Sequence, residues 1–151
     1  MTKKVFSCVL IGLGDIGLNY DLHRDQSKYI QTHSRAFFLN SGFDLQGGVD
    51  INTNACDFFT KKYKIKSYTL IAEALNEVKP DLIILALPTS FQLEAIKEII
   101  RCFVPKAILC EFKIEKSICL PLVGPGNALD DMILPDDYDD NFKMDKGMAP
   151  S

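Results

Sequence analysis

The chain alternates short apolar runs with segments in which apolar residues recur every three or four positions. Apolar runs of this length predict strands buried on both faces of a sheet. Apolar residues at every third or fourth position predict helices with one apolar face. The expected strands cover residues 5–11, 43–49, 67–69, 82–87 and 107–110. The expected helices cover residues 34–39, 54–63, 71–78 and 91–103, with Thr53 and Ser90 as candidate N-caps. This order predicts an α/β fold, a doubly wound parallel sheet with helices on both faces.

The alternation stops near residue 114, which divides the chain into a predicted domain, residues 1–114, and a tail, residues 115–151. Proline and glycine punctuate the tail, and from Pro121 onward it holds seven Asp against two Lys, so we expect a poorly ordered acidic segment. A D-x-D-x-N pattern begins at Asp137, but Phe142 stands where a calcium loop needs glycine, so no metal site is predicted. The body of the chain is near neutral, which argues against a nucleic-acid partner.

The apolar runs and the cysteines predict the cellular compartment of the protein. The longest interior apolar run, residues 82–87, is far too short to cross a bilayer, so no membrane partner is expected. Five cysteines, an odd number with no C-x-x-C spacing, include three within apolar runs, where a buried thiol is expected. These observations predict a cytoplasmic protein in a reducing compartment.

Three glycines follow the first predicted strand in the sequence V-L-I-G-L-G-D-I-G, residues 9–17. Gly12 would permit a tight turn, Gly14 would let the backbone approach a ligand, and Gly17 would let the next helix pack closely. Free amide groups at such a turn suit a diphosphate. The pattern predicts a dinucleotide site in a Rossmann-type sheet.

Asp50 ends the second predicted strand, where a carboxylate can accept both hydroxyls of an adenosine ribose and repel a 2′-phosphate. Its distance from Gly17 exceeds the usual interval of about 20 residues, so residues 18–32 must loop out. No Arg lies just beyond Asp50, and NAD is therefore favoured over NADP. The alternative role for Asp50 is to cap the next helix.

Pro88-Thr89-Ser90 ends the most hydrophobic predicted strand. In an open parallel sheet, ligands bind beyond the carboxyl ends of the strands, near the point where the strand order reverses. Small hydroxyl residues there can approach a cofactor ribose, and Ser90 can cap a helix at the same time.

Five segments in a fixed order extend this prediction: residues 9–17, T-H-S-R-A at 32–36, G-G-V-D at 47–50, L-P-T-S-F-Q at 87–92 and I-L-C-E at 108–111. Together they resemble the N-terminal domain of the Gfo/Idh/MocA oxidoreductases, the glucose–fructose oxidoreductase and inositol dehydrogenase family, over residues 5–111. That family binds NAD or NADP in this domain and oxidises or reduces sugars and cyclitols. The cofactor-binding positions that the resemblance implies are Gly12, Gly14, Asp15, Ile16, Gly17, Asp50, Pro88, Thr89 and Glu111.

Two positions depart from the family pattern. Gln92 stands where the family usually has His, and Glu111 is followed by Phe112 and Lys113 where the family has Glu-Lys-Pro. Gln92 and the displaced Lys113 are the catalytic candidates that this comparison leaves. His33 lies in the T-H-S-R-A segment, which in relatives lies near the nucleotide. The resemblance also implies a second α/β domain that supplies the substrate site, and residues 112–151 do not resemble it.

The leading hypothesis is an NAD-binding domain of a sugar or cyclitol oxidoreductase, truncated or diverged after Glu111. Its expected partners are the dinucleotide, a sugar-like molecule if a second domain is supplied, and a second copy or partner chain. The first alternative is a non-catalytic nucleotide-binding module that serves as a sensor or partner subunit. A second alternative, a methyltransferase, also uses a glycine turn and a ribose-binding acid.

Overall fold

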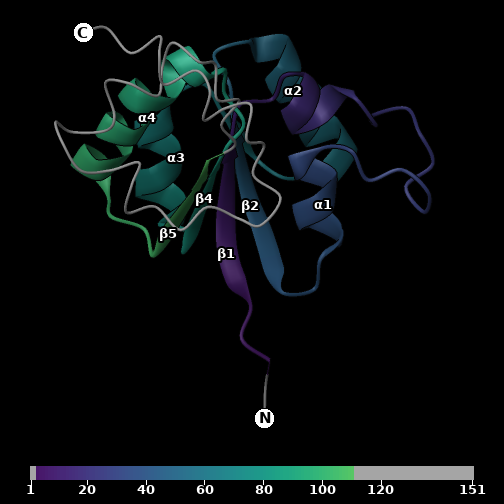
Figure 1. Ribbon diagram of the computed structural model, residues 1–151, viewed down its shortest axis with the longest axis horizontal. Helices are drawn as coiled ribbons and strands as arrows, with labels where there is room; N and C mark the ends of the chain where they lie inside the picture. Colours follow the sequence, from purple (N-terminus) through teal and green to yellow (C-terminus); the bar gives the residue numbers. More distant parts are fainter. Residues whose placement is uncertain (1–2, 111–151) are drawn as a thin grey trace, which may run out of the picture. The chain divides into compact units, whose positions relative to one another are not determined.

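The computed structural model describes residues 3–110, which form one parallel sheet with the strand order β3-β2-β1-β4-β5 (Figure 1). The strands are β1 (Phe6–Ile11), β2 (Phe43–Val49), β3 (Ser67–Tyr68), β4 (Leu82–Leu85) and β5 (Ala107–Cys110). The helical elements are the π-helix η1 (Asp15–Asn19), α1 (His33–Leu39), α2 (Thr53–Tyr63), α3 (Ile71–Val78) and α4 (Thr89–Cys102). The doubly wound parallel sheet is thereby confirmed, while the predicted tail lies outside the described residues.

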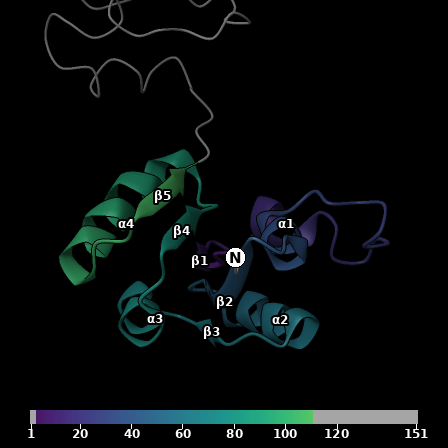
Figure 2. The same ribbon diagram turned by 90° about the horizontal axis from the view of Figure 1, so that it is seen from below.

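Residues 8–11 of β1 and 83–85 of β4 are buried on both faces of the sheet, which explains why these two segments are apolar throughout. Alternate residues of a strand point to opposite faces. In β1, Val9 and Ile11 join the core beneath α3 and α4, whereas Cys8 and Leu10 join the core on the other face with Phe59 of α2. Figure 2 shows α3 and α4 on one side of the strands and α1 and α2 on the other.

The strand order reverses between β1 and β4. The chain runs outward from β1 to β2 and β3, then returns across the sheet to β4 on the opposite side of β1. Ile11, the last residue of β1, lies opposite Val49 of β2 and Leu85 of β4. The carboxyl ends of these three strands therefore lie level with one another at the switch point.

Asp81 joins the amino ends of β1, β4 and β5. Its Oδ2 accepts hydrogen bonds from the Ser7 amide at 3.1 Å and the Ser7 hydroxyl at 3.3 Å, and its Oδ1 lies 2.8 Å from Lys106 Nζ. Its carbonyl also accepts from the Lys106 amide at 2.9 Å. The hydrogen bond from Lys106 is the largest cause that lowers the pKa of the Asp81 carboxyl. These bonds align the edge strand β5 with the centre of the sheet.

The helix starts differ from the prediction. Asn52, not Thr53, caps α2, because its side chain accepts from the amides of Asn54 at 3.0 Å and Ala55 at 3.4 Å. The helix α4 begins at Thr89 with Pro88 at the cap position, so Ser90 lies inside the first turn. The helix expected after the glycine turn is the single π-helical turn η1, in which the amides of Leu18 and Asn19 both donate to the Gly14 carbonyl.

Cysteines in the described residues are free thiols. Cys8 and Cys56 are buried, and Cys102 and Cys110 are partly buried. Burial, with a smaller contribution from the negative charge of Asp44, raises the pKa of Cys8 to about 12, so this thiol stays neutral.

A buried polar network fixes the long connection between η1 and α1. Asp21 and Arg35 are each 0% exposed, and Arg35 Nε lies 3.7 Å from Asp21 Oδ2. The Asp21 carboxylate also accepts from the Thr32 amide at 3.0 Å and the Thr32 hydroxyl at 2.7 Å. Arg35 Nη1 donates to the carbonyls of Arg24 at 3.2 Å and Tyr29 at 2.8 Å. The loop thus folds around a charged pair in the protein interior.

We expect Asp21→Asn to lower the free energy of unfolding by about 3–5 kcal/mol, because it leaves the Arg35 guanidinium buried without a counter-charge. Urea unfolding followed by circular dichroism measures this change. Glu94→Gln is the matched control, since Glu94 pairs with Lys97 on the surface of α4 and exposed pairs contribute little. Equal small effects of the two substitutions would contradict the structural role of Asp21.

Candidate functional site

The carboxyl ends of β1, β2 and β4 are joined directly at the glycine turn. The Gly12 amide donates to the Val49 carbonyl at 2.8 Å, and the Ala86 amide donates to the Ile11 carbonyl at 2.8 Å. The residues that follow each strand therefore emerge side by side at the switch point. This is where ligands bind in open α/β sheets.

Gly12 and Gly17 are required by sterics. Gly12 has φ +101°, and a Cβ there would lie 2.6 Å from the Ala86 carbonyl oxygen. A Cβ on Gly17 would overlap the Gly12 carbonyl oxygen. The two glycines thus let η1 return against the end of β1, as their spacing predicts.

Gly14 differs from both, because a Cβ there would meet no heavy atom within 4 Å. It precedes η1, where Asp15 and Ile16 are exposed to solvent. The first amides of a helix have no acceptor within the helix and remain available to a ligand. A one-turn helix carries a small dipole, so a diphosphate at the predicted site would depend mainly on the backbone amides of this turn.

Asp50 is fixed against the glycine turn. Its Oδ2 accepts from the Leu13 amide at 2.8 Å, and its Oδ1 accepts from the Asn52 amide at 2.8 Å. Its backbone amide donates to the Tyr68 carbonyl at 3.1 Å, and the Cys56 thiol lies 3.2 Å from its carbonyl. Each carboxylate oxygen keeps a further lone pair for another donor. Asn52, not Asp50, caps α2, and the Asp50 carboxylate instead bridges the Leu13 amide of the glycine turn and the Asn52 amide.

Pro88 and Thr89 follow β4 on the other side of β1. Pro88 is exposed and Thr89 is partly buried, and the loop between β4 and α4 lies against the glycine turn, because Leu87 Cδ2 is 3.2 Å from the Cβ position of Gly12. The structure therefore brings this loop, the glycine turn and Asp50 together at the carboxyl end of the sheet. Their contacts with a cofactor stay a prediction.

The remaining predicted residues are placed differently. Gln92 is 2% exposed, and its Nε2 donates to the Leu87 carbonyl at 2.9 Å. Glu111 and Lys113 lie outside the described residues. In the T-H-S-R-A segment, Thr32 caps α1, and Ser34 and Arg35 are buried, so this segment builds the interior of the domain.

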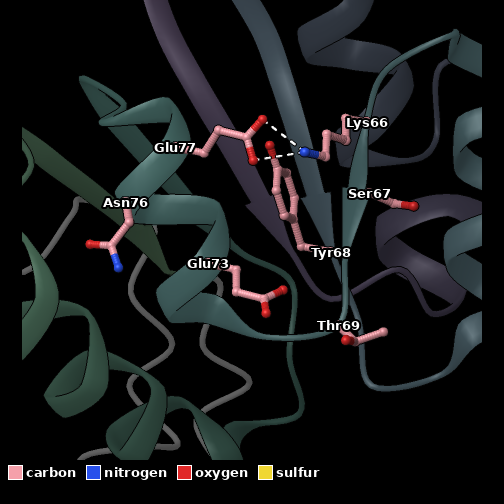
Figure 3. A pocket seen from close by; sticks show the side chains of 7 residues that line it. All are labelled: Lys66, Ser67, Tyr68, Thr69, Glu73, Asn76 and Glu77. Atoms are coloured by element: carbon pink, nitrogen blue, oxygen red, sulfur yellow. Dashed lines mark hydrogen bonds and ion pairs between the residues drawn. The ribbon is translucent and has the colours of Figure 1, made fainter.

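An open groove of about 710 Å³ lies at the far edge of the sheet, beside β3 and α3 (Figure 3). Lys66 Nζ lies 2.7 and 2.8 Å from the two carboxylate oxygens of Glu77, and this bond lowers the pKa of Glu77. The lining residues are Lys66, Ser67, Tyr68, Thr69, Glu73, Asn76 and Glu77. None belongs to the predicted cofactor site, which is formed by loops at the switch point.

Within residues 3–110, no helix is long and apolar enough to cross a membrane. The same part of the chain contains no group of three or more His, Cys, Asp or Glu side chains that could hold a metal ion.

Comparison with protein families matches residues 6–112 to the Gfo/Idh/MocA oxidoreductase family with an NAD-binding Rossmann fold. The chain belongs to this family, and the residues matched are its NAD-binding domain. Comparison with curated proteins finds no match.

Solved structures with the same fold include two inositol dehydrogenases. Myo-inositol 2-dehydrogenase from Lactobacillus plantarum has 17% identity and a TM-score of 0.54, with 71% of this chain and 28% of that chain covered. Scyllo-inositol dehydrogenase from Lactobacillus casei has 16% identity and a TM-score of 0.56, with 76% and 30% covered.

The WlbA dehydrogenase from Bordetella pertussis, solved with NADH and UDP-GlcNAcA, has 16% identity and a TM-score of 0.52, with 68% of this chain and 26% of that chain covered. The chain therefore spans less than a third of the length of these similar structures.

Alanine substitutions at two glycines test which of them the fold requires. We expect Gly12→Ala to lower the free energy of unfolding by about 1–3 kcal/mol or more, because a side chain is strained at this φ and meets the Ala86 carbonyl. Gly14→Ala is the matched control and should leave the melting temperature nearly unchanged, because the added methyl group points into open space. Thermal melts measure both, and equal losses of stability would contradict the open position of Gly14.

Proposed function

We propose that the loops at the switch point bind NAD, with the diphosphate at the glycine turn, the adenosine ribose at Asp50 and the nicotinamide side at Pro88 and Thr89. The observation that carries this proposal is the 2.8 Å hydrogen bond from the Leu13 amide to the Asp50 carboxylate. This bond brings the carboxylate that follows β2 against the glycine turn. The adenosine ribose and the diphosphate are directly linked in NAD, so the two groups must bind at neighbouring positions.

Exposed apolar side chains support the same placement. Ile51 is 90% exposed directly after Asp50, Ile16 is 43% exposed at the start of η1, and Phe91 is 63% exposed in the first turn of α4. Large apolar groups exposed to solvent often mark ligand sites. A dinucleotide would offer its two planar ring systems to such side chains.

The preference for NAD over NADP follows from charge. A 2′-phosphate at the adenosine ribose would approach the Asp50 carboxylate, and like charges repel. Residues 51–54 read I-N-T-N and supply no cation to offset this repulsion.

The chemical role we propose is that of the NAD-binding part of an oxidoreductase acting on a sugar or cyclitol. The family and the inositol dehydrogenases of the same fold support this substrate class. Of the two catalytic candidates, Gln92 has an amide that does not titrate and that is buried and bonded to the Leu87 carbonyl, and Lys113 lies outside the described residues. This observation favours a second candidate function, a nucleotide-binding module without turnover of its own. Formation of NADH from NAD with inositols or sugars would select the oxidoreductase over the module.

We expect Asp50→Asn to weaken NADH binding by about 10- to 100-fold, because the amide loses the charge and one of the two acceptors that the ribose hydroxyls need. NADH fluorescence titration of the intact chain measures the affinity, and a melting curve checks the fold. Asp57→Asn is the matched control, because Asp57 is exposed on α2, one turn from the cap. Equal NADH affinity of the two variants would overturn the ribose assignment.

The intact chain should also bind NADH at least about 10-fold more tightly than NADPH, because Asp50 repels the 2′-phosphate. Asp50→Asn should narrow this difference by removing the charge. Competition titrations with both dinucleotides measure the ratio. A wild-type preference for NADPH would contradict the proposed role of Asp50 while leaving dinucleotide binding itself intact.

A further inference from the structure

We propose that Gln92 is a positioning residue that holds the loop between β4 and α4 in the shape that receives the nicotinamide side of the cofactor. The proposal rests on the proposed function, since it takes Pro88 and Thr89 as the cofactor-facing part of this loop. Gln92 itself is buried and acts through the Leu87 carbonyl, which its Nε2 contacts at 2.9 Å.

The Leu87 carbonyl lies in the loop between strand β4 and helix α4. Strand β4 ends at Leu85, and the turn that opens α4 is closed by a bond from the Phe91 amide to the Pro88 carbonyl at 2.9 Å. Leu87 thus belongs to neither the sheet nor the helix. The Gln92 side chain reaches back from the first turn of α4 and supplies a donor to this carbonyl.

The backbone around this bond is already restricted. Pro88 has φ −53° and no amide hydrogen, and a residue that precedes proline is confined to extended conformations. What remains to be set is the orientation of the peptide plane between Leu87 and Pro88. A hydrogen bond to the Leu87 carbonyl sets that plane, and with it the direction in which Pro88 and Thr89 leave the strand.

The position of Gln92 on α4 also favours a specific role for its amide. Gln92, Ala95 and Ile99 form the buried face of this helix, at the spacing where an apolar residue is expected. Burying an amide among apolar neighbours costs free energy unless it forms hydrogen bonds. A leucine would fill the space at lower cost, but it could not donate to Leu87.

Gln92→Leu tests the proposal, because it keeps a side chain of similar volume and removes the donor. We expect NADH binding to weaken about 3- to 10-fold, the effect of losing one neutral hydrogen bond, and ADP binding to stay unchanged. ADP would occupy the glycine turn and Asp50 but not the nicotinamide side. A residue that only stabilises the fold would not separate the two ligands.

Gln92→Glu supplies a second readout in the same buried position. A protonated carboxyl can donate to the Leu87 carbonyl, whereas the ionised form cannot. NADH affinity of this variant should therefore approach that of the wild type at low pH and fall as the pH rises through the raised pKa of the buried carboxyl. The wild-type protein, measured over the same pH range, provides the reference.

Titration of the wild-type chain and both variants with NADH and with ADP tests the positioning role of Gln92. A selective loss of NADH affinity in Gln92→Leu, or a pH-dependent rescue in Gln92→Glu beyond the wild-type change, supports the positioning role. Equal losses for both ligands, or no loss in a folded variant, overturn it while leaving the cofactor site in place. Failure of the wild-type chain to bind either ligand would instead overturn the proposed function, and the positioning role with it.

Discussion

The close approach of three backbone segments at Gly12 is the constraint on which the rest of the site depends. Gly12 lies between the Ala86 carbonyl of the β4 end and Gly17 of η1, with no room for a side chain on either glycine. Only this packing lets the chain turn back after β1 and still leave the ends of β2 and β4 beside it. The glycine turn, the Asp50 carboxylate and the β4–α4 loop, the three parts of the proposed cofactor site, are neighbours for that reason.

Much of this arrangement could be predicted from the sequence because it depends on local patterns. The bounds predicted for β2, α3 and β5 agree with the structure, since apolar runs and helical spacing record burial directly. The sequence predicts Asp50 at the end of the second strand despite the long intervening segment, and the structure places its carboxylate against the glycine turn. The structure explains how, because residues 22–31 loop outward and the Asp21–Arg35 pair holds their ends.

Other features could not be predicted because they depend on contacts between distant residues. Asp21 and Arg35 look like ordinary surface charges in the sequence, and only the fold buries them together. The choice of Asn52 over Thr53 as the cap of α2 depends on the turn that Asp50 starts. Gln92 interrupts an apolar stripe, a signal that could have indicated a buried hydrogen bond, but its acceptor is a backbone carbonyl that no side-chain pattern reveals.

The central claim is that the dinucleotide binds at the switch point, and amide NMR spectra of the intact chain during titration with NADH test it most directly. Binding at this site predicts saturable shifts for Leu13, Gly14, Ile51 and Thr89, with Asn76 and Glu77 of α3, which line the groove, unchanged. Shifts centred on the groove at α3, or no shifts at high NADH concentration, would contradict it.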